Sequence, residues 1–431
     1  MSRALFGTDG VRGVAGEYPL DDTGAFAIGR AVGTQFAKEG EQIVMACDTR
    51  ESSEHLVGRI AEGLRSVGVN VVFTGVMPTP GLAYVTARHP EFVAGVMITA
   101  SHNPFEYNGV KVFSAEGGKL PDAAEEKLND DIEAGVPDRG VGIYSVQTLA
   151  AEYESFLTNS AEGERFGGMR LAVDTANGAA SEVADRVFTE LGAEVVAIGN
   201  TPDGRNINVR CGATNTEALR ETVLANSCVL GIAVDGDADR LIMIDSQGRE
   251  VNGDTVLYIL AVGHDFDCVV ATVMTNLGAE KAMARKGIDL ERTAVGDRYV
   301  LERLLETGYH LGGEQSGHII LPDIATTGDG VLAAIQVLRV LKASGKSLDD
   351  WRDEVVMLPQ ALVNFSIDDK TKLDLPAVVQ YVAQQTAGLG ERGRILVRPS
   401  GTEPLARVMV EAPDAQAMAE TIAAHLQELV A

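Results

Sequence analysis

A recurring alternation of apolar and polar segments runs through most of the chain. An apolar run, a polar turn, an amphipathic stretch of helical period, a glycine and a second apolar run follow one another three times. This order is typical of a βαβ unit, in which a helix connects two parallel strands. We therefore expect three tandem α/β domains, with first strands at 43–47, 171–174 and 268–273, helices at about 54–67, 181–191 and 279–285, and second strands at 69–73, 194–198 and near 293.

The end of the chain follows a different pattern. Candidate strands at 395–397 and 407–410 flank a turn of Gly, Ser and Pro, and an amphipathic stretch covers 415–429. Two strands and a helix predict a smaller α+β domain. Turn signals divide the chain into segments 1–150, 151–247, 248–360 and 361–431. Because ligands bind at the carboxyl ends of parallel strands, the domains are expected to surround a central cleft.

Composition and charge indicate a globular protein and argue against binding to nucleic acid or membranes. The chain has 431 residues, 45% of them hydrophobic and 23% charged, which is typical of a globular multidomain protein. A formal net charge of −26 opposes binding to nucleic acid or to an anionic membrane. The four cysteines are scattered, which suits small core residues in a reducing compartment, and neither an export signal nor a membrane-spanning apolar run is recognisable. We expect a cytoplasmic protein.

Ser101 is the first candidate for chemistry. It follows the apolar run 93–100 and opens a Ser-His-Asn-Pro sequence, so a buried strand would deliver its hydroxyl to a loop. A strand-end serine that only satisfies a turn is the alternative. The dipeptide 108–109, Asn-Gly, predicts a tight turn that would set the cation of Lys111 on the next strand. No G-x-S-x-G sequence surrounds Ser101, so a hydrolase triad is not supported.

A second candidate is a run of three alternating carboxylates, Asp235, Asp237 and Asp239, between apolar strands at 229–234 and 241–244. In an extended loop their side chains would point the same way and repel unless a hard divalent cation, naturally Mg²⁺, neutralised them. A solvated acidic turn is one alternative. A haloacid-dehalogenase-type phosphatase, which also starts from a strand and D-x-D, is another, but a third carboxylate favours a metal site over an aspartyl nucleophile.

Three further loops carry polar side chains. Residues 398–407, Arg-Pro-Ser-Gly-Thr-Glu-Pro and a second arginine, combine hydroxyls, guanidinium groups and a glycine turn, which are the groups of a phosphate site. A plain polar hairpin is the alternative. The Gly-rich segment 6–13 offers Arg12 to a phosphoryl group. In the segment 312–318, Glu314 and Ser316 could hydrogen-bond to sugar hydroxyls.

Taken in this order, the five segments resemble the α-D-phosphohexomutase superfamily over essentially the whole chain. The resemblance implies an intramolecular phosphotransferase in which Ser101 carries the phosphoryl group and, with the three aspartates, binds Mg²⁺. The C-terminal loop would grip the substrate phosphate. The substrate-binding residues implied in this way are Arg240, Gly296, Asp297, Arg298, Glu314, Ser316, Arg398, Ser400, Gly401, Thr402 and Arg407.

Within the superfamily, segments 6–13, 312–318 and 326–330 are similar to the phosphoglucosamine mutases. Gln315 is the main marker, because relatives that act on mannose or glucose phosphates commonly carry Met there. The Asn-Ile-Asn at 206–208 also resembles that subfamily, whereas positions 213 and 215 are Ala and Asn in place of Ser and His. The implied reaction interconverts glucosamine 6-phosphate and glucosamine 1-phosphate for UDP-N-acetylglucosamine synthesis.

The implied cycle starts from phosphorylated Ser101 and passes through a bisphosphorylated sugar. Arg12 would offset negative charge, and either Lys111 or His102 would move the hydroxyl proton. Glucosamine 1,6-bisphosphate, autophosphorylation or a kinase would prime Ser101. We expect a monomer or homodimer that acts on a small phosphosugar, without a nucleic-acid or membrane partner. Three alternatives remain: a phosphomannomutase or phosphoglucomutase of the same superfamily, a metal-dependent sugar phosphatase, and a catalytically silent phosphosugar sensor.

Overall fold

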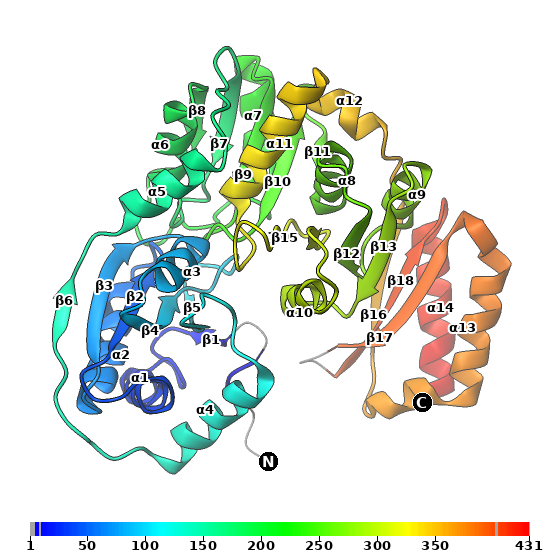
Figure 1. The fold of residues 1–431 in the computed structure, drawn as a ribbon. Coiled ribbons are helices and arrows are strands. Elements are labelled where there is room, and N and C mark those ends of the chain that lie inside the picture. Colours follow the sequence, from blue (N-terminus) through cyan, green and yellow to red (C-terminus); the bar gives the residue numbers. More distant parts are fainter. Residues whose placement is uncertain (1–4, 8–9, 401–403, 431) are drawn as a thin grey trace. The chain divides into compact units, whose positions relative to one another are not determined.

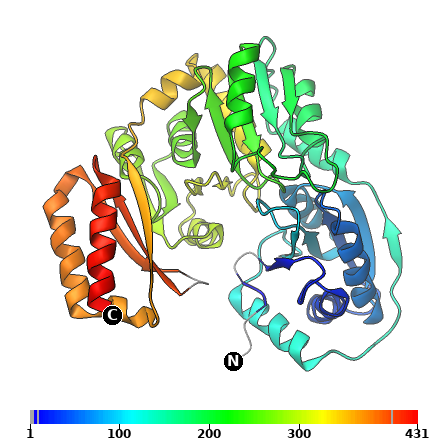
Figure 2. The ribbon, with the colours of Figure 1, turned by 180° about the vertical axis from the view of Figure 1, so that it is seen from behind.

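The computed structural model describes residues 5–7, 10–400 and 404–430, and it contains four β-sheets, of six, five, four and three strands (Figure 1). The chain forms two compact units. The first comprises residues 1–274 and 290–352, and the second comprises residues 275–289 and 353–431. Three α/β sheets and a smaller C-terminal sheet confirm the predicted fold class, and the view from behind shows the helices that cover the sheets (Figure 2).

The first sheet has the strand order β1-β5-β4-β2-β3-β6 and is covered on both faces. Alternate residues of its central strands point to opposite faces, so Ile43 and Met45 pack with α1 and α2, and Val44 packs with α3. The elements are β1 (Val11–Val14), α1 (Asp22–Phe36), β2 (Gln42–Cys47), α2 (Ser53–Ser66), β3 (Asn70–Val76), α3 (Thr79–Arg88), β4 (Phe92–Ile98), β5 (Tyr107–Ser114), α4 (Asp122–Ala134) and β6 (Tyr144–Val146).

The tight turn predicted at Asn108-Gly109 is wrong. Both residues lie inside β5, and the connection from β4 to β5 is the longer loop that carries Ser101. The glycine is needed for close strand approach, because a Cβ on Gly109 would lie 2.5 Å from the carbonyl oxygen of Thr99. Lys111 is nevertheless on the strand that follows Ser101, as expected.

The second sheet has the order β11-β10-β9-β7-β8. Its strands β9 and β10 are antiparallel neighbours, and residues 235–240 connect them. The three aspartates therefore lie in a hairpin connection at one edge of the sheet. The elements are α5 (Ala150–Asn159), β7 (Arg170–Asp174), α6 (Val183–Glu190), β8 (Glu194–Ile198), α7 (Glu217–Asn226), β9 (Leu230–Val234), β10 (Leu241–Asp245) and β11 (Glu250–Val251).

The third sheet has the order β13-β12-β14-β15, and residues 314–318 connect its antiparallel strands β14 and β15. The side chain of Asn252 accepts a hydrogen bond from the Thr255 amide and so caps α8, and Asp329 caps α11 in the same way. The elements are α8 (Gly253–Gly263), β12 (Cys268–Thr272), α9 (Leu277–Arg285), β13 (Asp289–Thr293), α10 (Asp297–Thr307), β14 (Gly312–Gly313), β15 (Ile319–Ile320), α11 (Gly330–Ser344) and α12 (Leu348–Asp353).

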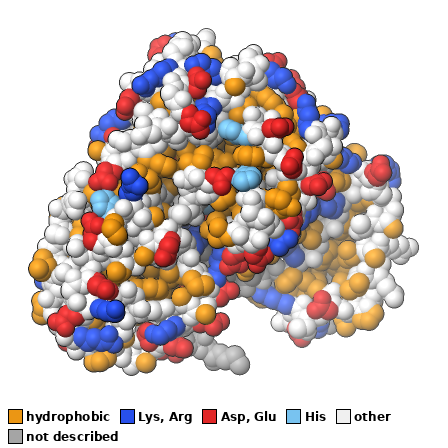
Figure 3. Space-filling model, viewed as in Figure 1, with side chains coloured by type: hydrophobic (Ala, Val, Ile, Leu, Met, Phe, Trp, Pro, Cys, Tyr) orange, Lys and Arg blue, Asp and Glu red, His pale blue; other side chains and the backbone are white. Residues whose placement is uncertain are grey.

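The C-terminal sheet, β16-β18-β17, is antiparallel and packs one face against α14 and α13. Its elements are β16 (Gln360–Ser366), α13 (Pro376–Leu389), β17 (Arg394–Pro399), β18 (Leu405–Glu411) and α14 (Ala415–Val430). The four cysteines are buried and unbridged, which confirms that they are core residues. Among the described residues, no helix has the length and apolarity needed to cross a bilayer. Charges of both signs are interspersed over the face in Figure 3.

Candidate active site

Ser101 lies three residues beyond the end of β4 and is almost completely buried, with 2% of its surface exposed. Its backbone is left-handed, with φ of 51°, and its N–H donates to Oγ1 of Thr99 at 3.0 Å. The hydroxyl donates to Oδ2 of Asp235 at 2.6 Å, and Nδ1 of His102 lies 3.3 Å from Oγ. The serine is thus held by its backbone, while its hydroxyl faces the aspartate loop.

Two side chains outside the predicted site hold the Ser101 loop by its carbonyls. Arg50 donates to the carbonyl oxygens of Ser101 at 2.9 Å and Asn103 at 2.8 Å, and Asn208 donates to the same two oxygens at 2.9 and 3.1 Å. Asp48 fixes the buried guanidinium of Arg50 at 2.8 Å. Asn208 belongs to a segment that the sequence had marked. Arg50 follows the first predicted strand in a polar turn, which gives no signal of this contact.

Asp235, Asp237 and Asp239 are buried, and each offers a carboxylate oxygen within 4.8 Å of the others. They converge through a turn and not through the expected extended loop. The N–H of Ala238 donates to the carbonyl oxygen of Asp235 at 3.0 Å, and Ala238 has a left-handed φ of 61°. The turn brings all three side chains together while β9 and β10 continue as a hairpin.

The carboxylates fit a hard divalent cation. Oδ1 of Asp237 and Oδ1 of Asp239 are buried and have no hydrogen-bond partner among the described residues. Burial raises the pKa of Asp235, and its neighbours Asp239 and Asp237 add to this shift. Buried oxygens without donors, in a cluster of like charges, are the ligand set that Mg²⁺ takes. The residues therefore suit a magnesium site.

Lys111 of β5 and Thr79 of α3 hold the aspartate loop. Nζ of Lys111 lies 2.7 Å from Oδ2 of Asp237 and 3.0 Å from Oδ2 of Asp239. The hydroxyl of Thr79, at the start of α3, donates to Oδ2 of Asp237 at 2.5 Å, and its N–H donates to the Asp237 carbonyl at 3.0 Å. Thr79 was not predicted from the sequence, since a Thr-Pro helix start is common and carries no sign of its partner.

The predicted cations Arg12 and Arg240 lie near the serine. Nη1 of Arg12, on β1, donates to Oδ1 of Asn103 at 3.0 Å, which connects the N-terminal segment to the Ser101 loop. Nε of Arg240 lies 3.9 Å from Oδ1 of Asp239. Burial lowers the pKa of His102 to about 4, with further lowering by Arg240 and Arg12. Both effects favour the neutral form of the imidazole beside Ser101.

A second polar cluster surrounds the start of α10. Asp297 contacts Nζ of Lys119 at 2.6 Å and Nε2 of His318 at 3.0 Å. Burial opposes ionisation of Asp297, but Lys119 and His318 hold its pKa well below the usual range. The Gly296 N–H donates to Oε1 of Glu314 at 3.0 Å. This cluster joins two predicted substrate-binding segments, at 296–298 and 314–318. Ser316, also predicted, is exposed.

Arg298 is buried and ion-paired. Its guanidinium contacts carboxylates of α4 and α10: Asp122, Glu125 at 3.2 Å and Glu302 at 3.0 Å. Burial raises the pKa of Glu125 to about 7. In this structure Arg298 therefore ties α10 to α4, and its predicted role toward substrate stays a prediction.

The predicted phosphate loop lies in the second unit. Arg398 and Arg407 are opposite each other on β17 and β18, and Nη2 of Arg407 donates to Oγ of Ser400 at 3.2 Å. Burial and Arg407 lower the pKa of Arg398. Lys370, which was not predicted from the sequence, donates through Nζ to the Ser400 carbonyl. Two of these cations, Arg407 and Lys370, contact Ser400, and such a concentration of positive charge suits an anion. Gly401 and Thr402 lie outside the described residues.

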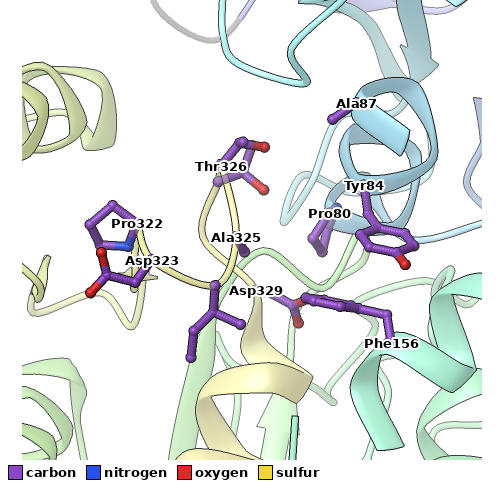
Figure 4. A pocket seen from close by; sticks show the side chains of 11 residues that line it. Pro80, Tyr84, Ala87, Phe156, Pro322, Asp323, Ala325, Thr326 and Asp329 are labelled. Carbon is purple, nitrogen blue, oxygen red and sulfur yellow. The ribbon is translucent and has the colours of Figure 1, made fainter. Parts of the chain in front are cut away.

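A cavity of about 150 Å³ lies beside the elements that hold the aspartate loop (Figure 4). Pro80 of α3 and Asp329, the cap of α11, line it. Each neighbours a residue that contacts the aspartate loop: Thr79 donates to Asp237, and the Gly330 N–H donates to the Ala238 carbonyl at 2.9 Å. The cavity is separate from the serine and the three aspartates, none of which lines it.

Comparison with known proteins identifies the family. The chain matches the descriptions "Phosphoglucomutase/phosphomannomutase, alpha/beta/alpha domain I" at residues 3–138, domain II at 151–248, domain III at 252–357 and the C-terminal domain at 362–427. It is 48% identical to a phosphoglucosamine mutase of Deinococcus radiodurans, over 96% of this chain and 94% of that one. It is 45% identical to a phosphoglucosamine mutase of Thermus thermophilus, over 99% and 98%.

Solved structures share the fold. A phosphoglucomutase/phosphomannomutase family protein from Burkholderia thailandensis is similar with a TM-score of 0.83 and 25% identity, covering 100% of this chain and 97% of that one. The N-acetylphosphoglucosamine mutase of Aspergillus fumigatus, solved with GlcNAc-6P and magnesium, has a TM-score of 0.70 at 16% identity, with 99% and 95% covered. The chain belongs to the phosphoglucomutase/phosphomannomutase family and is an enzyme of the phosphosugar mutase class.

Proposed function

We propose that the protein interconverts glucosamine 6-phosphate and glucosamine 1-phosphate, and so supplies amino-sugar nucleotide synthesis. The observation that carries the proposal is the contact of 2.6 Å between the Ser101 hydroxyl and Asp235, within a cluster of three buried aspartates. Relatives 43–48% identical over nearly the whole chain are named for the glucosamine reaction, which supports the choice of sugar.

Asp235, Asp237 and Asp239, with the phosphorylated Ser101, would hold Mg²⁺, which when bound stabilises negative charge on the transferring phosphoryl group. Ser101 starts the cycle as a phosphoserine. The free hydroxyl of the sugar monophosphate attacks the phosphorus, the bond to Ser101 Oγ breaks, and the sugar becomes a bisphosphate. After the sugar reorients, Ser101 Oγ attacks the other phosphate and takes it back, which releases the positional isomer.

Neighbouring side chains would move the proton and balance the charge. His102 has a ring nitrogen 3.3 Å from Ser101 Oγ. Lys111 contacts two of the aspartates, Asp237 at 2.7 Å and Asp239 at 3.0 Å. We propose that one of these two accepts the sugar hydroxyl proton and returns it to the next leaving oxygen. Arg12 lies beside the Ser101 loop through Asn103, where its charge would stabilise the phosphoserine.

The remaining predicted residues would bind the substrate. Glu314 and Ser316 are assigned to the sugar hydroxyls, residues 296–298 to the far end of the substrate, and Arg240 to the substrate as well. The grip on the distal phosphate is assigned to Arg398, Ser400, Gly401, Thr402 and Arg407. Arg407 and Ser400 contact each other at 3.2 Å, which supports a shared role.

We also propose roles for the four segments, a cellular location, an oligomeric state and a means of priming Ser101. Segments 1–150, 151–247, 248–360 and 361–431 are proposed as the serine, metal, sugar and phosphate domains. The protein would work in the cytoplasm as a monomer or homodimer, with Ser101 primed by glucosamine 1,6-bisphosphate, by autophosphorylation or by a kinase.

A phosphate-shift assay tests the proposal. Purified protein with Mg²⁺ and a trace of bisphosphate is offered the 6-phosphates of glucosamine, glucose and mannose, and each 1-phosphate is measured. One charge-assisted hydrogen bond to the amine is worth about 1.5–3 kcal/mol. The value of kcat/KM for glucosamine 6-phosphate should therefore be roughly ten- to a hundredfold higher than for the 6-phosphates of glucose and mannose. A higher kcat/KM for glucose or mannose 6-phosphate would overturn the choice of sugar. Release of inorganic phosphate would indicate the phosphatase, and binding without turnover the sensor.

A further inference from the structure

Gln315 connects the loop between β14 and β15 to the first turn of α8. Residues 314–317 form a turn, in which the Gly317 N–H donates to the Glu314 carbonyl at 3.0 Å. The side-chain amide of Gln315 donates to Oδ2 of Asp254 at 3.2 Å, and the Gln315 carbonyl accepts from the Gly253 N–H at 3.1 Å. Both the backbone and the side chain of Gln315 are therefore bound to α8.

The two segments approach closely. A Cβ on Gly253 would lie 2.0 Å from the Glu314 carbonyl oxygen, so only glycine allows this contact. Asp254 is fully buried, with 0% of its surface exposed, and stands in the first turn of α8. The helix dipole favours a negative charge in this turn, and the Asp254 carboxylate accepts the hydrogen bond of the neutral Gln315 amide.

The side chains on either side of Gln315 have different surroundings. Gln315 turns toward α8, whereas Glu314 accepts from the Gly296 N–H at 3.0 Å and Ser316 is exposed. We propose that Asp254 is a positioning residue of the sugar loop, which acts through Gln315 and sets the affinity for the sugar. The inference rests on the proposed function, in that Glu314 and Ser316 bind the sugar hydroxyls.

A double-mutant cycle tests the pair. Gln315→Glu sets two carboxylates against each other and should raise KM for glucosamine 6-phosphate about tenfold or more, with kcat changed less than about threefold. Asp254→Asn keeps an acceptor but loses its charge, so its KM should rise less. In the double variant the asparagine amide can donate to the new glutamate, so KM should return to within about threefold of the wild type. Gln384→Glu, on the exposed face of α13, should change neither constant.

The outcomes are distinct. An unchanged KM in Gln315→Glu would overturn the inference. So would a double variant whose KM rises by the product of the two single increases. A merely structural contact would lower Tm while the folded fraction kept its KM. If Gln315→Glu does not fold, Gln315→Met removes the donor without adding charge and should raise KM in the same direction. If the wild type itself does not turn over glucosamine phosphate, the proposed function fails, and the same cycle is then measured as glucose 6-phosphate binding by calorimetry.

Discussion

The hydroxyl of Ser101 lies 2.6 Å from Oδ2 of Asp235, although 134 positions separate the two residues in the chain. Ser101 follows a strand of the first sheet, and Asp235 opens the connection between two strands of the second sheet. The contact joins the predicted phosphoryl carrier to the predicted metal ligands. The first two predictions test these roles.

The phosphoserine is the most direct prediction. Protein purified without phosphatase treatment should carry one phosphoryl group on Ser101, because each completed cycle returns the phosphate to that hydroxyl. Intact-mass and peptide mass spectrometry would detect it. Ser101→Ala should lose the modification and about three or more orders of magnitude in kcat. A phosphate on Asp235 would instead indicate an aspartyl phosphatase.

The metal cluster and the phosphate loop should give different kinetic effects. Asp237→Asn weakens charge stabilisation of the transferring phosphoryl group, so kcat should fall by about a hundredfold or more with little change in KM. Arg407→Ala removes a residue proposed to contact the bound phosphate and should mainly raise KM. Steady-state kinetics on both variants checks this, and chelation of the wild type should reproduce the loss of kcat. Identical effects would contradict the separation of roles.

Thr79 should matter through Asp237. Thr79→Val keeps the shape but removes the hydroxyl that donates to Asp237 Oδ2, so the carboxylate loses one of the groups that orient it. Loss of such a partner commonly weakens metal binding or activity about ten- to a hundredfold. A magnesium titration of activity should therefore show a higher half-saturating concentration. Thr86→Val is the matched control, since Thr86 is buried in the same helix and donates to the Leu82 carbonyl.

Asp329 should make stability depend on pH. Burial raises its pKa to about 6, above that of an unfolded aspartate, so the folded state binds the proton more tightly. Its contribution to the free energy of unfolding is therefore greatest below about pH 4 and is lost as pH rises to about 6, by roughly 3 kcal/mol.

Asp329→Asn tests this shift, because asparagine can still cap α11 and accept from Tyr153. Between about pH 4 and 6.5 the Tm of the wild type should fall relative to the Tm of Asp329→Asn. Asp130→Asn, at an exposed site on α4, serves as the control. A difference that stays constant over this range would refute the prediction.

Local pattern determined the fold class and the principal candidates. Period-two and period-3.6 spacing predicted β2, β8, α14 and their neighbours within a few residues, because burial of one face imposes that spacing on the sequence. The Ser-His-Asn-Pro sequence after a strand and the three alternating aspartates singled out Ser101 and Asp235. These signals are short-range, and they can be found in one sequence.

Tertiary structure alone decided how these residues are held. Asn108 and Gly109 look like a turn but lie inside β5, where the approach of neighbouring strands admits only a glycine at position 109. The aspartates converge through the left-handed Ala238, which no propensity predicts. The contacts of Arg50 with Ser101, of Thr79 with Asp237 and of Asp254 with Gln315 join separate segments. Packing determines which of these distant residues meet, and the sequence around each residue does not indicate its partner.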